Sequence, residues 1–239
     1  MPRDLYTRYP RPLLWLVPGG DLWIEGQPGI AAQRVEIAPF YLSKLPVDNE
    51  QFEAFDPGFQ RGAASAGDRD PAVGVSWEEA QAYCAWYAEI ARKPIRLPDE
   101  LEWEHACRAG NRARAFWGDD PEGAEEHAWD ARNSGGRVPR LEAKRANEHG
   151  LYGVLGGVWE WTASPWRELP AAEVGRGDAT LPPDAPRVLR GGSFRVDRAV
   201  LGCALRKAAA PGERFDDAGF RIARSLRQGR PGVPPWALG

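Results

Sequence analysis

The chain has few cysteines for its length and no long apolar run. Three cysteines, at positions 84, 107 and 203, occur among 239 residues, and this odd, low count argues against a disulfide framework. No apolar stretch reaches the ~18 residues of a membrane span. The charged first four residues (MPRD) are unlike a secretory signal. We therefore expect a cytoplasmic protein with reduced thiols and no contact with a membrane.

Lysine is scarce relative to arginine, and methionine occurs once. Among 31 basic residues, lysine stands only at positions 44, 93, 144 and 207. This bias fits a thermostable protein, although codon bias alone would give the same pattern. A net charge of −3 without a basic block excludes a general affinity for nucleic acid. The expected partner is therefore a protein or a small-molecule ligand.

Glycine and tryptophan, by contrast, are concentrated in residues 150–161 (GLYGVLGGVWEW). Glycine permits positive φ and close backbone approach, whereas tryptophan buries a large surface. The stretch is therefore predicted to be a tight, buried turn around which the domain is organised. We expect Trp159→Ala and Trp161→Ala each to cost ~3–5 kcal/mol of stability.

Three segments carry a helix-start signal, in which a side-chain acceptor is followed three residues later by Glu or Gln. The predicted helices are residues 49–55 after Asp48, 77–92 after Ser76 and 100–109 after Asp99. The second and third are the two main helices, because apolar residues recur in them at helical spacing. Cys84 and Cys107 fall on these helices and are predicted to be core residues.

Short alternating or apolar runs predict strands between the helices. The first two are expected to form a hairpin across Pro18-Gly19-Gly20. The predicted strands are residues 13–17, 22–25, 33–42, 187–189 and 220–223. Residues 112–149 and 165–186 show no periodicity and are predicted to be irregular loop.

These elements predict one α+β domain with two main helices, short antiparallel strands and much irregular loop. We place the domain at residues 13–225. An extended arm of residues 1–12 is expected before it, and a proline-rich tail of residues 226–239 after it.

Motifs spread over residues 16–223 resemble, in the same order, those of the sulfatase-modifying-factor family. This family comprises formylglycine-generating enzymes and iron-dependent sulfoxide synthase domains. The matching stretches are VPGG at 17–20, FYL at 40–42, PV at 46–47, NEQF at 49–52, VSWEEA at 75–80, YCAW at 83–86, RLPDELEWE at 96–104, NS at 133–134, RGGSF at 190–194 and GFR at 219–221. The resemblance implies a C-type lectin-like fold of the formylglycine-generating-enzyme type. It does not fix the activity, because one fold carries many functions.

The resemblance also implies a copper(I) site made of two cysteines shortly after the RGGSF motif. This chain has Val196 and Leu201 at those positions, and aliphatic side chains cannot ligate a metal. A non-catalytic protein is therefore expected. A metal-dependent oxidoreductase with a relocated site is the alternative. The remaining candidates for such chemistry are the solitary Cys203 and the histidines at positions 105, 127 and 149.

Calcium is the second metal that the resemblance implies. The corresponding ligands would be the carbonyl groups of Leu155, Gly156 and Val158 and the carboxylate of Glu160. Calcium takes roughly six to eight oxygen ligands, so this set supplies only part of a site. The alternative is that Glu160 accepts hydrogen bonds from backbone N–H groups of the turn and that no cofactor is bound.

The residues between RGGSF and GFR form the predicted binding face. A chemically mixed set of side chains lies there between two framework motifs, an arrangement that resembles lectin-fold variable proteins diversified by retroelements. Such proteins bind through exposed side chains on a rigid scaffold. The predicted ligand-binding residues are Arg195, Val196, Asp197, Val200, Leu205, Lys207, Ala208, Ala209, Glu213, Phe215, Asp216 and Asp217.

The sequence therefore predicts a non-catalytic ligand- or protein-binding domain on a formylglycine-generating-enzyme scaffold. A retroelement-diversified receptor is one form of this hypothesis. Besides the oxidoreductase, a structural or regulatory subunit that docks through its proline-rich ends remains as an alternative.

Overall fold

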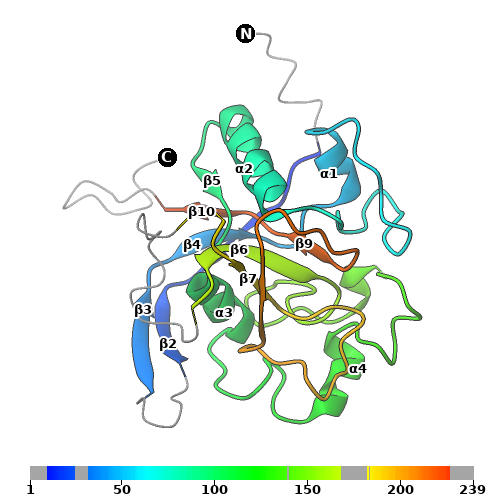
Figure 1. The fold of residues 1–239 in the computed structure, drawn as a ribbon. Coiled ribbons are helices and arrows are strands. Elements are labelled where there is room, and N and C mark those ends of the chain that lie inside the picture. The colour runs from blue at the N-terminus through cyan, green and yellow to red at the C-terminus, as the bar shows by residue number, and fades with distance from the viewer. Residues whose placement is uncertain (1–9, 25–31, 139, 168–181, 183, 227–239) are drawn as a thin grey trace, which may run out of the picture.

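The computed structural model describes residues 10–24, 32–138, 140–167, 182 and 184–226. Within these ranges, two main helices lie against short strands that are joined by long connecting segments (Figure 1). The predicted arm and tail lie outside the described residues except for residues 10–12 and 226. Most of the predicted loop 165–186 lies outside them as well.

The helices begin at the residues predicted to cap them. Asp48, Ser76 and Asp99 each accept a hydrogen bond from the backbone N–H three residues on, and the side chain there bonds back to the cap. All three predicted helices are confirmed. One further short helix lies within the predicted loop 112–149 and was not predicted. The helices are α1 (Asn49–Glu53), α2 (Trp77–Ala91), α3 (Glu100–Arg108) and α4 (Ala124–His127), with 3₁₀ turns at Pro121–Gly123 and Leu141–Ala143.

The first sheet brings together strands from both ends of the domain. Its order is β1-β4-β10-β5, and β4 pairs antiparallel with both β1 and β10. β10 in turn pairs antiparallel with β5. The strands are β1 (Leu14–Val17), β4 (Phe40–Ser43), β10 (Ala223–Ser225) and β5 (Ile95–Arg96).

The predicted hairpin between the first two strands is wrong. β1 pairs with β4, whereas β2 (Gly20–Ile24) pairs with β3 (Gln33–Ile37) in a separate two-stranded ribbon. The predicted strand 33–42 is therefore two strands, β3 and β4, in different sheets. Pro39 lies at the break, where it cannot donate a ladder hydrogen bond.

The second four-stranded sheet starts at the glycine-rich stretch. Its order is β8-β7-β6-β9; β6 pairs antiparallel with β7 and parallel with β9. The predicted strand 220–223 is split between β9 and β10, which lie in the two different sheets. The strands are β6 (Trp159–Pro165), β7 (Arg187–Arg190), β8 (Arg206–Ala209) and β9 (Ala218–Phe220).

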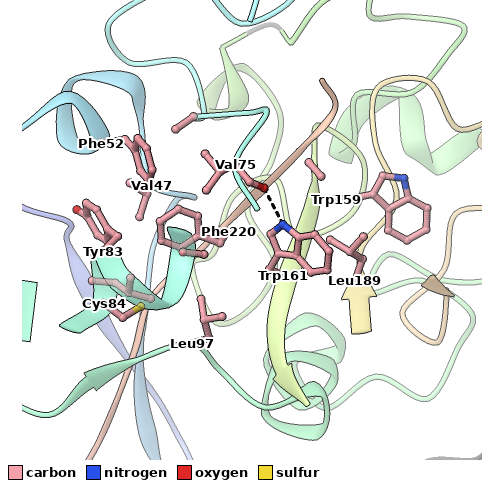
Figure 2. Close-up of a cluster of buried hydrophobic side chains, with 14 of the residues drawn as sticks. Val47, Phe52, Val75, Tyr83, Cys84, Leu97, Trp159, Trp161, Leu189 and Phe220 are labelled. Carbon is pink, nitrogen blue, oxygen red and sulfur yellow. Dashed lines mark hydrogen bonds between the residues drawn. The ribbon is translucent and has the colours of Figure 1, made fainter. Parts of the chain in front are cut away.

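The main apolar core lies between α2 and β6. Phe52, Tyr83, Trp161 and Phe220 are buried there with Cys84 (Figure 2). The indole Nε1 of Trp161 donates to the carbonyl oxygen of Val75 at 2.9 Å. On the other side of β6, Trp103 of α3 packs in a second buried cluster. The tryptophans of β6 therefore face α2, and the intervening Glu160 faces α3.

The turn before β6 has the predicted glycine conformations. Gly150, Gly153, Gly156 and Gly157 all have positive φ, between 61° and 73°. A side chain at Gly156 would collide with the backbone of Trp129. The prediction of a tight, buried turn is confirmed.

Candidate functional site

Glu160 has its carboxylate engaged on both oxygens. Arg221 donates from Nε to Oε2 at 2.7 Å and from Nη2 to Oε1 at 2.8 Å. Trp103 Nε1 donates to Oε2 at 2.7 Å. Glu160 and Arg221 are both fully buried, and the other guanidinium hydrogen bonds go to the carbonyl groups of Ser43, Lys44 and Tyr152. The pair therefore joins β6 to the end of β4 and to the glycine-rich turn.

This arrangement does not fit the predicted calcium ligands. A guanidinium already lies against the Glu160 carboxylate, where a cation would have to bind, and like charges repel strongly in a buried site. The donors to Glu160 are the side chains of Arg221 and Trp103, and not the backbone N–H groups of the turn that the alternative expected. Among the described residues, no group of three or more His, Cys, Asp or Glu side chains is placed to hold a metal ion.

The two positions implied for copper lie in an apolar cluster. Leu201 is fully buried with Ala124 and Ala128, and Val196 and Leu205 pack against them. The contact is close because Gly192, at φ +75°, has no Cβ that would meet Leu201. Hydrocarbon thus fills this region, and neither position carries an atom that binds Cu(I).

The ends of the predicted binding face are tied together. Arg195 donates to both carboxylate oxygens of Asp216 at 2.6 Å, and both side chains are largely exposed. Asp217 accepts from the Ser193 hydroxyl at 2.6 Å. Asp197 pairs with Arg132. The N–H of Ala199 and then Arg132 hold the pKa of Asp197 below its usual range.

The remaining predicted face residues differ in accessibility. Val200 is 56% exposed, and Ala208 and Glu213 are also exposed. Lys207 of β8 places Nζ 3.5 Å from the ring centroid of Phe215. The prediction that Ala209 binds a ligand is wrong, because this residue is buried in the main core and its side chain cannot meet a ligand.

The sulfatase-modifying factor enzyme 1-like domain matches residues 6–226. The chain belongs to this family. Its C-type lectin-like α+β fold, as expected, is that of the family.

Curated members of the family resemble the chain over part of their length. Bovine formylglycine-generating enzyme is 33% identical over 169 residues, which cover 64% of this chain and 43% of the bovine protein. The mouse inactive C-alpha-formylglycine-generating enzyme 2 is 35% identical over 178 residues, 67% of this chain and 50% of the mouse protein. The chain thus spans about half the length of these relatives.

Solved structures agree on the fold. Treponema denticola variable protein 1 superposes with a TM-score of 0.76 at 20% identity, covering 89% of this chain and 94% of the other. PvdO from Pseudomonas aeruginosa gives the same TM-score and coverage at 25% identity. No helix in the described part of the chain is long and apolar enough to cross a membrane.

Cys203 of this family member is not solitary, which corrects the prediction. Its Sγ lies 3.3 Å from Sγ of Cys107 on α3, and both residues are fully buried. Burial raises the pKa of the Cys107 thiol well above its usual range, which favours the thiol over the thiolate form. The 96 residues between the two cysteines left no local spacing by which the pair could be predicted.

We expect diamide to link Cys107 to Cys203 and to leave Cys84 free. Two thiols would give up two protons and two electrons to diamide and form one S–S bond, for which the sulfur atoms must approach to ~2.05 Å. Peptide mapping without reduction measures the link, and Cys107→Ser should abolish it. A disulfide that includes Cys84 would contradict the geometry.

Two of the three candidate histidines lie close together. The rings of His105 and His149 are 5.9 Å apart between centroids. Nε2 of His105 lies 2.9 Å from the carbonyl oxygen of Pro18. Burial, followed by the proximity of His105, lowers the pKa of His149. His127 instead stacks on Trp117, so the structure does not bring the three histidines together.

Proposed function

We propose that this family member is a non-catalytic binding domain. Its ligand, a protein or a small molecule, contacts the exposed residues between Arg195 and Asp217. The observation that carries the proposal is the apolar packing of Val196 and Leu201, at the positions where the family resemblance implies copper thiolates. A scaffold that places hydrocarbon there keeps its shape without the means to bind Cu(I).

Family membership is compatible with loss of activity. One mouse relative carries the word inactive in its name, and the bovine relative is named as an enzyme, at similar identity to this chain. The chemistry of the individual positions therefore carries the proposal, and the overall similarity does not.

The proposed face combines a fixed frame with exposed side chains. Ser193, Phe194 and Phe220 of the flanking motifs are buried, whereas Arg195 and Asp216 are exposed between them. Recognition by loops on a rigid frame follows this pattern. In its narrower form the proposal is a retroelement-diversified receptor. Substitutions confined to residues 195–217 in other copies of the gene would support that form, and substitutions spread evenly over the chain would overturn it.

We expect protein exposed to Cu(I) to show no oxidation of a cysteine-containing peptide in air. Turnover is measured as formylglycine by mass spectrometry, and copper content by competition with a chromophoric Cu(I) chelator. Stoichiometric copper together with turnover would overturn the proposal. If both were lost in Cys203→Ala but kept in the matched variant Cys84→Ala, the activity would belong to a relocated site at Cys203.

A further inference from the structure

A cavity of about 620 Å³ opens beside the proposed face. It lies between the end of α3, the segment that follows it, and the segment before β8. A second cavity of about 270 Å³ is lined in part by β2. It shares Arg108 and Arg112 with the larger cavity. The larger cavity is lined by Arg108, Arg112, Ala113, Arg114, Asp119, Val200, Gly202, Ala204 and Leu205.

A buried guanidinium group of the cavity wall, that of Arg108, shares its carboxylate partner with a second buried arginine. Arg108 is buried, with a side chain 8% exposed, and its Nε lies 2.8 Å from Glu104 Oε1. The other carboxylate oxygen of Glu104 pairs with Arg190, which is also buried. One carboxylate therefore serves two buried guanidinium groups. The two guanidinium groups exceed that carboxylate by one positive charge, and this excess favours an added anion.

Arg108 and Arg112 have donors left for a ligand. Arg108 uses Nε for Glu104 and Nη1 for the carbonyl of Ala113, and its Nη2 has no partner among the described residues. Arg112 is exposed, stacks 4.4 Å from the ring centroid of Trp23, and pairs with no carboxylate in the described ranges.

Arg114 is fixed in place by the opposite wall. Its Nε and Nη2 donate to the carbonyl of Leu201 at 2.9 and 2.7 Å, and Nη2 also reaches the carbonyl of Arg198. Asp119, the acidic residue of the lining, accepts from the backbone N–H of Arg114. Three arginines against one aspartate leave the lining with two positive charges in excess.

The opposite side of the cavity is apolar. Val200 is 56% exposed there, and Ala204 and Leu205 continue the wall. A solvent-exposed valine next to guanidinium groups matches a ligand that has a charged end and a hydrocarbon body. Arginine binds carboxylate and phosphate oxygens through paired N–H groups.

We infer that this cavity binds an oxyanion carried on an apolar body, either a carboxylate or a phosphate monoester. Arg108 and Arg112 hold the anion, and Val200 and Leu205 contact the hydrocarbon part. The inference rests on the proposed function and deepens it, because Val200 and Leu205 belong to the proposed face. Sequence reasoning did not find this site, since Arg108, Arg112 and Arg114 precede the segment on which it concentrated.

The test is a titration of the full chain with small probes. Binding is measured by calorimetry and by NMR of the arginine side-chain N–H groups. Hexanoate and hexyl phosphate carry a carboxylate and a phosphate on the same six-carbon body. The probe that binds more tightly identifies the head group. Hexanol lacks the charge, and acetate lacks the body. We expect one saturable site for an anionic hexyl probe, shifts at Arg108 and Arg112, and at least about tenfold weaker binding of hexanol and acetate.

Variants separate the two halves of the site. Arg112→Gln and Val200→Asp change exposed residues, and each is expected to weaken the anionic probe about tenfold. The matched control Arg140→Gln removes an exposed arginine outside the cavity and should leave affinity unchanged. Equal binding of hexanol and hexanoate, or full affinity in Arg112→Gln, would overturn the inference.

The same preparations are assayed for oxidation of a cysteine peptide. Absence of probe binding without oxidase activity would overturn only the anion site. Oxidase activity would overturn the binding-domain proposal itself.

Discussion

Trp161→Ala is expected to lower the free energy of unfolding by ~3–5 kcal/mol. The indole is fully buried between α2 and the sheet, and its removal leaves a cavity among Tyr83, Phe220 and their neighbours. It also leaves the buried carbonyl of Val75 without its donor. Urea unfolding followed by circular dichroism measures the loss. Trp159→Ala, which affects the same cluster from a position 8% exposed, is expected to fall in the same range.

The matched control is a tryptophan outside this cluster. Trp15 of β1 is 46% exposed, so Trp15→Ala should cost about 1 kcal/mol or less. If Trp161→Ala and Trp15→Ala unfold at the same urea concentration, the buried turn does not organise the core.

Arg221→Met is expected to cost about 3–5 kcal/mol, because it leaves the Glu160 carboxylate buried without its partner. The substitution keeps most of the side-chain volume, so the loss reports the charge and its hydrogen bonds. Three backbone carbonyl groups lose their donor in the same variant. Chemical unfolding of the variant and the parent gives the difference.

A double variant tests whether the pair itself is responsible. Glu160→Gln with Arg221→Met removes both charges, and we expect it to be more stable than Arg221→Met alone. The two substitutions should therefore be strongly non-additive. Simple addition of their separate costs would show that the charges do not act on each other.

The local features of the fold were predictable from the sequence, and the non-local pairings were not. Asp48, Ser76 and Asp99 mark helix starts because a cap and its return bond lie within four residues. The hairpin proposed for β1 failed because the turn at Pro18 is equally compatible with a change of sheet. Nothing within β1 identifies β4, about 25 residues later, as its partner.

In the candidate site, too, positions close to a motif could be predicted and distant partners could not. Val196 and Leu201 could be identified by counting from RGGSF, because the spacing is short. The partner of Glu160 is 61 residues away, and the partner of Cys203 is 96 residues away. Alternation along β8 would have placed Ala209 inside, but that strand was not predicted. Such partners follow from the topology and not from a motif.

The position of β10 in the first sheet has a consequence for synthesis of the protein on the ribosome. β10 lies between β4 and β5, while β9, a few residues earlier, completes the other four-stranded sheet. Until residues 218–225 have left the ribosome, the first sheet lacks its inner strand β10 and the second lacks its edge strand β9. Glu160 then also lacks the positive charge of Arg221. Both sheets therefore close only after nearly all of the domain has been translated, and the strands next to β9 and β10 have unpaired edges until then.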